Sequence, residues 1–186
     1  MTEYCNSAPG HPLHGPYHDT EYGFPGKGER GLFELLCLEI FQAGLSWELV
    51  LKKRPTTVEA FDGFDVDTVA AYGETQIERL LANPGIIRNR LKITSIIHNA
   101  GIIQGLRTSA DGQGGFVGWL GHHHPLELGA WVKLFKKTFK FTGPEVVNEF
   151  LMSTGYLGGA HEESCPVYKD VLKTNPPWLT AAKAKL

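Results

Sequence analysis

Residues 32–47 of the chain read LFELLCLEIFQAGLSW, and nearly every position up to residue 41 is apolar. A helix that is apolar almost all the way round belongs in the centre of a fold rather than on its surface. The stretch therefore predicts a central helix from Leu32 to Ala43, ended by Gly44, with Cys37 inside the core.

The rest of the chain has the same helical rhythm, with apolar residues three and four apart between Gly, Pro and Asn. Ser46 is suited to cap a second helix that ends at Arg54, ahead of Pro55. No pair of strands is apparent, and the predicted fold class is all-α. Further helices are expected over 57–61, 66–72, 75–82 (with a Thr75-x-x-Glu78 capping box), 87–103 (with Leu91, Ile93, Ile96, Ile97 and Ala100 toward the core), 116–120, 128–137 and 144–154.

Composition limits the kinds of protein that the chain can be. It has 186 residues, 18 Lys and Arg against 20 Asp and Glu, and 42% hydrophobic residues. These values are typical of one globular domain spanning 1–186, in one or two helical lobes. The tail over 166–186 is expected to be partly loose. No apolar run reaches the ~18 residues that span a bilayer. The net charge of −2 means that a nucleic-acid surface would have to be a local basic patch.

The first residues, MTEYCN, lack the basic flank and apolar segment of a signal peptide. We therefore expect a cytoplasmic protein whose three cysteines are reduced and form no disulfide framework.

Two cysteines and two histidines near the chain ends form a candidate metal site: Cys5, His18, His161 and Cys165. Such a Cys₂His₂ set suits zinc, which would tie the two ends together. No CxxC spacing is present, and spacing alone favours two buried thiols and two surface imidazoles. The consecutive His122, His123 and His124 suggest a solvated loop more than a metal site.

Glu39 lies three and four positions after Leu36 and Leu35, on an apolar helix face. A buried carboxylate is costly, and such costs are often kept at functional sites. The alternative, a structural Glu paired with an arginine, is equally open from the sequence. Gln42, one turn further on, could share the same cavity.

The turn formed by residues 43–47 places Leu45 at its tip, beside Gly44, and Trp47 at the start of the next helix. A leucine in such a turn is usually a core residue, but it can also wedge into a base stack. Trp47 and Tyr17 could stack on a base, although core packing accounts for most Trp residues.

The segment 133–144 has the form of a helix-hairpin-helix: a basic helix, a short turn with Gly143, and a proline that starts the next helix. Amides at that helix N-terminus, with Lys140 and Lys137 beside them, would bind DNA phosphates without reading the sequence. The turn at Pro84-Gly85, followed by the basic residues 88, 90 and 92, is a weaker candidate.

Taken together, these residues resemble the DNA-3-methyladenine glycosylase I family of helix-hairpin-helix-like base-excision enzymes. The resemblance covers roughly residues 4–165 and is strongest in YHDTEYG at 17–23 and LEIFQAGLSW at 38–47. It continues through VLKKR at 50–54, GIIRNRLKI at 85–93, FKFTG at 139–143 and HEESC at 161–165.

The resemblance implies an activity and a set of roles. The four Cys and His residues would be structural zinc ligands. A flipped base would lie against Glu39, as the catalytic and lesion-recognising residue, with Tyr17, Trp47, Gln42 and Tyr22 binding the base. The expected enzyme is a monomer that hydrolyses the N-glycosidic bond of 3-methyladenine in double-stranded DNA and leaves an abasic site.

A cationic base makes this chemistry plausible, because its glycosidic bond is already weak and a carboxylate and electron-rich aromatic faces suit its charge. Two alternatives stay open from the sequence: a lesion-binding module of the same fold without turnover, and a zinc hydrolase that uses residues 122–124.

Overall fold

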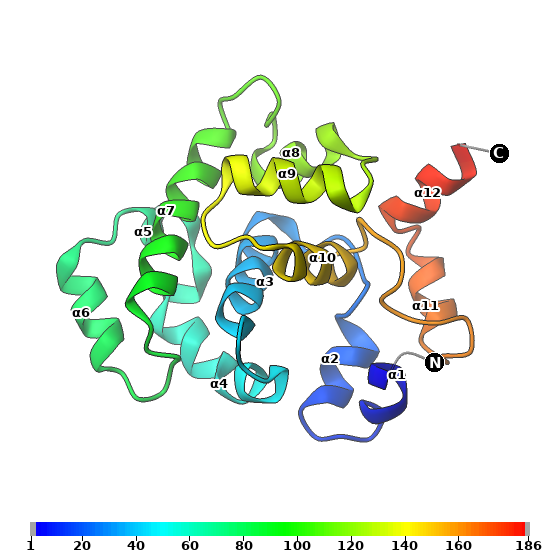
Figure 1. Cartoon of the computed structure of the whole chain (residues 1–186), viewed down its shortest axis with the longest axis horizontal. Helices are drawn as coiled ribbons and strands as arrows, with labels where there is room; N and C mark the ends of the chain where they lie inside the picture. Colours follow the sequence, from blue (N-terminus) through cyan, green and yellow to red (C-terminus); the bar gives the residue numbers. More distant parts are fainter. Residues whose placement is uncertain (1–2, 185–186) are drawn as a thin grey trace. The chain divides into compact units, whose positions relative to one another are not determined.

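The computed structural model describes residues 3–184, and these residues form helices and no strand (Figure 1), which confirms the all-α prediction. None of the helices in this range is long and apolar enough to cross a membrane. The elements are α1 (Glu3–Ser7), α2 (His14–Thr20), α3 (Gly28–Gln42), α4 (Trp47–Ala60), the 3₁₀ helix η1 (Asp62–Phe64), α5 (Val66–Ala70), α6 (Glu74–Ala82), α7 (Arg90–Leu106), α8 (Gly115–His123), α9 (Leu128–Thr138), α10 (Pro144–Ser153), α11 (Tyr168–Lys173) and α12 (Pro177–Ala184).

The chain divides into two compact units. One unit is the continuous segment Lys27–Val147, which we call the central unit. The other, the terminal unit, combines the beginning of the chain up to Gly26 with its end from Asn148 onward. The chain passes from the central to the terminal unit within α10.

The central unit is built around α3, as its apolar sequence predicts. Helix α3 contacts α4, α7, α8 and η1, and Cys37 on it is fully buried. An aromatic cluster of Phe116, Trp119, Trp131, Phe135 and Phe139 joins α8 to α9, with ring centroids 5.4–6.3 Å apart. All five aromatic side chains are buried and form the core of this part of the central unit.

Helix α4 does not end before Pro55, as the sequence suggested, but continues to Ala60 and absorbs the short helix predicted over 57–61. A proline inside a helix removes one backbone hydrogen bond. The turn that follows it compensates by burying Thr57 and Ala60, and the Thr57 hydroxyl donates to the Lys53 carbonyl at 2.8 Å.

Two predicted helix starts are shifted. Helix α6 is capped at Gly73, whose amide donates to Gln76 Oε1 at 2.9 Å, so the predicted box from Thr75 to Glu78 is wrong. Helix α7 starts at Arg90 rather than residue 87, because the Asn89 side chain caps it by accepting from the Lys92 amide at 3.1 Å.

Leu91 was predicted to face the core, and this is wrong: it is 63% exposed. At about 100° of rotation per residue, Leu91 lies roughly opposite Ile93 and Ala100 on α7, outside the stripe that Ile93, Ile96 and Ala100 bury.

In the terminal unit, the Gly23 amide donates to the Ser153 carbonyl at 3.0 Å and so joins the two ends of the chain. The short helices α1 and α2 were not predicted from the sequence. Helices α11 and α12 occupy the segment that was expected to be partly loose. Residues 185 and 186 of that segment lie outside the described residues.

Candidate active site and metal centre

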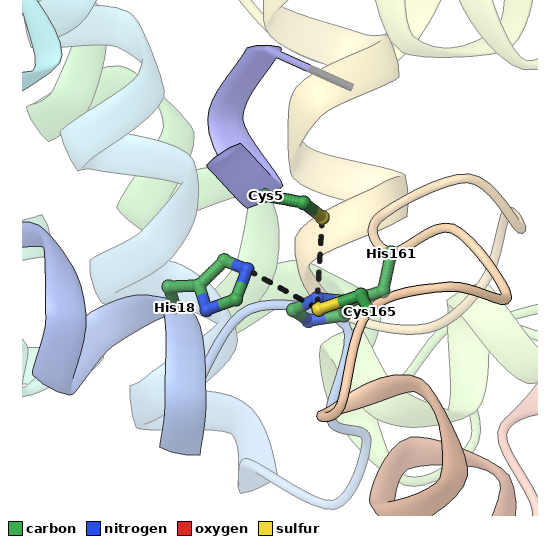
Figure 2. A group of neighbouring side chains, drawn as sticks. All are labelled: Cys5, His18, His161 and Cys165. Carbon is green, nitrogen blue, oxygen red and sulfur yellow. Dashed lines mark hydrogen bonds between the residues drawn. The ribbon is translucent and has the colours of Figure 1, made fainter. Parts of the chain in front are cut away.

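Four side chains of the terminal unit converge on one point: Cys5 from α1, His18 from α2, and His161 and Cys165 from the segment between α10 and α11 (Figure 2). All four are buried, and one ligand atom from each lies within 4.8 Å of the others. The sequence-predicted set is therefore assembled in space. The alternative of two surface imidazoles is wrong, because His18 is 0% and His161 5% exposed.

The separations within this cluster fit a tetrahedral metal ion. Cys165 Sγ lies 3.5 Å from His161 Nδ1 and 3.7 Å from His18 Nε2, and Cys5 Sγ lies 3.8 Å from His161 Nδ1. Zinc bonds of about 2.3 Å to sulfur and about 2.0 Å to nitrogen, at tetrahedral angles, give a sulfur–nitrogen separation of about 3.5 Å.

Both imidazoles are oriented by a second hydrogen bond on the ring nitrogen that points away from the sulfurs. His18 Nδ1 lies 2.7 Å from Asp19 Oδ1, and His161 Nε2 lies 2.8 Å from the Tyr22 carbonyl. Metal-bound histidines characteristically make such outer hydrogen bonds, which fix the tautomer. Burial lowers the pKa of His161, which favours the neutral form that binds metals.

In the central unit, Glu39 is buried within α3, 4% exposed, as its place on an apolar face predicts. On the neighbouring helix α4, Arg54 Nε donates to Glu34 Oε1 at 2.7 Å. Glu34, which precedes Glu39 on the same helix, therefore forms an ion pair with this arginine.

The loop between α3 and α4 is tight and presents its leucine to solvent. Gly44 has φ +80°, a left-handed conformation that favours glycine, and Leu45 is 39% exposed. Ser46 caps α4 as predicted, accepting from the Leu49 amide at 3.3 Å. Trp47 and Gln42, on either side of the loop, are half-buried.

The hairpin between α9 and α10 borders a groove of about 630 Å³ lined by Ala43, Lys136, Lys140, Phe141, Gly143 and Pro144, among others. The residue with left-handed backbone is Phe141, at φ +62°, and not Gly143. A Cβ at Gly143 would meet nothing within 4 Å among the described residues. The fold thus makes no steric demand for this glycine. Lys137 and Lys140 are both exposed.

Tyr17 and Tyr22 belong to the terminal unit, and both are buried there with ring centroids 5.7 Å apart. The Tyr22 hydroxyl donates to Glu149 Oε2 at 3.0 Å, a contact that the sequence did not suggest. The two tyrosines therefore lie side by side in the terminal unit, and their role in binding a base stays a prediction.

Other basic and histidine candidates are placed less favourably. Arg90 is engaged by Glu74, at 2.7 Å, and by Glu78. His122 and His123 end α8 rather than forming a loop, and in the described part of the chain the three consecutive histidines join no metal-binding group. A zinc hydrolase built on residues 122–124 therefore has no structural support.

Sequence reasoning missed two buried polar residues of α7. Lys92, which was grouped with phosphate-binding cations, is 4% exposed, and Asn99 is fully buried. Only their unfavourable burial marks them as unusual, and that burial cannot be read from composition or spacing.

Comparison with known structures defines the class of protein first: an all-helical DNA glycosylase. The chain matches a crystal structure of 3-methyladenine DNA glycosylase I with a TM-score of 0.76 and 34% identity, over 87% of this chain and 97% of the other. A second match is a tyrosine-to-phenylalanine variant of 3-methyladenine DNA glycosylase I in complex with 3-methyladenine, with a TM-score of 0.77 and 29% identity, over 88% and 96% of the two chains.

The sequence comparisons identify the family. The methyladenine glycosylase model matches residues 7–124, and DNA-3-methyladenine glycosylase 1 of Escherichia coli K12 is 35% identical over 182 residues, 89% of this chain and 97% of its own. The chain belongs to the methyladenine glycosylase family, which confirms the resemblance seen in the sequence.

Proposed function

We propose that the protein is a monomeric DNA glycosylase that flips 3-methyladenine out of double-stranded DNA and hydrolyses its N-glycosidic bond, leaving an abasic site. Family membership supports the reaction, and the relative with bound 3-methyladenine supports the substrate. Such an enzyme would act in the cytoplasm, with the chromosome. The observation that carries the proposal is a buried carboxylate, Glu39, one tight loop away from the exposed Leu45.

The chemistry assigned to Glu39 is recognition of a charged base. A 3-methylated adenine carries a positive charge that it loses when it leaves as the free base. A carboxylate held in a poorly solvated position attracts that charge more strongly than it would in water. Its acceptor oxygens suit the base edge, and the Trp47 ring, with Gln42 nearby, could bind the flipped base. Tyr17 and Tyr22 stay predictions as base-binding residues.

We propose that zinc occupies the Cys₂His₂ cluster. Four protein ligands complete a tetrahedral coordination, so the ion would have a structural role and no open position for water or substrate. The support is the donor set, its sulfur–nitrogen separations and the hydrogen bonds behind both histidines.

Leu45 is proposed to fill the gap that the flipped nucleotide leaves in the duplex. Leu45→Ala should lower excision from duplex DNA by about tenfold and from single strands by less than about twofold, because only the duplex must be unstacked. The measurement is 3-methyladenine release from matched methylated duplex and single-stranded oligonucleotides. Leu91→Ala, which truncates another exposed leucine, serves as the control. Equal losses on both substrates would exclude the wedge.

The hairpin is proposed to bind DNA phosphates through Lys140, Lys137 and the backbone amides near Gly143. Lys140→Ala should weaken binding by a similar factor on all sequences and reduce the slope of log K against log salt by about one. Titrations at several salt concentrations measure this slope. The control is Lys173→Ala, because Lys173 pairs with Asp170 on α11 at 2.7 Å. An unchanged slope would show that Lys140 does not contact a phosphate, and Arg88 would then be the next cation to test.

A further inference from the structure

Lys92 is a buried cation whose partners are backbone carbonyls. Its Nζ donates to the Phe41 carbonyl at 2.8 Å and to the Ala43 carbonyl at 2.6 Å. These carbonyls belong to the last turn of α3 and to the loop that follows it. A helix leaves its last carbonyls without partners inside the helix, and a cation satisfies them and the helix dipole together. Lys92 thus holds the base of the loop that carries Leu45.

The same ammonium also lies against the hairpin. Lys92 Nζ is 5.6 Å from the centroid of the Phe141 ring. Phe141 is the residue with left-handed backbone in the hairpin, and it lines the groove together with Ala43. The Lys92 side chain therefore contacts both the Leu45 loop and the hairpin, the two segments that are proposed to bind DNA.

Asn99 extends this support two turns further along α7. Its Nδ2 donates to the Lys140 carbonyl at 3.0 Å, and its Oδ1 accepts from the Lys140 amide at 2.8 Å. Residues seven apart lie on one face of a helix. The buried face of α7 thus holds the backbone of the Leu45 loop through Lys92 and the backbone of the hairpin through Asn99.

We propose that Lys92 is a positioning residue for base flipping, which sets the Leu45 loop against the phosphate-binding hairpin. The proposal rests on the proposed function. The loop needs such support, because Gly44 leaves its backbone permissive and the Leu45 side chain is exposed. A wedge must enter the base stack at a fixed offset from the phosphates that the hairpin holds. A displacement of about 1 Å at such a site can cost up to about a hundredfold in rate.

The test compares Lys92→Met with the unmodified protein on methylated duplex DNA, methylated single strands and free 3-methyladenine. Methionine keeps the length of the side chain and removes the donors and the charge. We expect duplex excision to fall at least about tenfold, with single-strand excision and affinity for the free base changed less than about twofold. In a Leu45→Ala background, Lys92→Met should cause little further loss on duplex DNA, because the wedge that it positions is already absent.

Lys173→Met is the control for removal of one lysine charge, and Lys92→Arg should recover part of the duplex activity. If Lys92→Met does not fold, Lys92→Gln replaces it, keeps one donor group, and should show the same duplex-specific loss at smaller size. Equal losses on duplex and single strands, or full additivity with Leu45→Ala, would overturn the proposal. An unmodified protein that releases no 3-methyladenine from either substrate would instead contradict the proposed function.

Discussion

Glu39→Gln is expected to lower 3-methyladenine excision at least about tenfold, the factor that one charge-assisted interaction of about 1.4 kcal/mol provides. Glutamine keeps the shape of the side chain, removes its charge and replaces one acceptor oxygen by a donor. Glu39 is proposed to contact the flipped base and no other part of the DNA. Affinity for undamaged DNA should therefore stay nearly unchanged. Single-turnover release of the base and titration of unmodified duplex measure the two quantities.

The matched control for this variant is Glu34→Gln on the same helix. Glu34 pairs with Arg54, so its replacement should lower stability slightly and leave excision intact. If Glu39→Gln unfolds easily while its folded fraction excises at the normal rate, Glu39 is a structural residue and its assignment to the base fails.

Loss of the metal should have the largest effect on stability. Zinc bound at the proposed four-ligand site would connect α1 and α2 to the segment before α11, so Cys165→Ser should abolish binding of about one zinc per chain. We expect a loss of at least roughly 4 kcal/mol, a modest part of the ~10–16 kcal/mol that structural zinc contributes to small domains. For a chain of this length that is a fall in melting temperature of about 10 °C or more.

Elemental analysis and thermal melts, each with and without a chelator, measure these changes. Cys37→Ser is the control, because Cys37 is buried in the core outside the cluster. It should destabilise the protein while retaining its zinc and its sensitivity to the chelator. A Cys165→Ser protein with unchanged zinc content and melting temperature would refute the site.

The parts of the fold that the sequence predicts best are those in which a single helix face meets the core. Helices α3 and α9 were placed to within four residues of their starts, since their apolar pattern is long and their ends carry clear signals. The end of α4 was wrong, because burial of Thr57 and Ala60 outweighs the cost of Pro55, and such burial is a property of the assembled unit.

The candidate site divides in the same way. Burial of Glu39 follows from its place on an apolar helix face and could be predicted, whereas the exposure of Leu45 could not, because a leucine in a tight turn is usually a core residue. The Cys₂His₂ cluster joins residues more than 140 positions apart, so the resemblance to a family indicated it better than spacing did. The burial of Lys92 could not be predicted from the sequence, because a lysine that follows two arginines looks solvated. Its partners, the Phe41 and Ala43 carbonyls, are about fifty positions away in the chain and are brought beside it only by the fold.

The central claim is excision of 3-methyladenine, and release of the free base tests it most directly. Duplex DNA treated with a methylating agent is incubated with the purified protein, and the released bases are separated by chromatography. The account predicts that 3-methyladenine appears in the soluble fraction, that an equal number of abasic sites appears in the DNA, and that Glu39→Gln suppresses both. Tight binding of the methylated duplex with no released base would contradict it and identify a lesion-binding module without turnover.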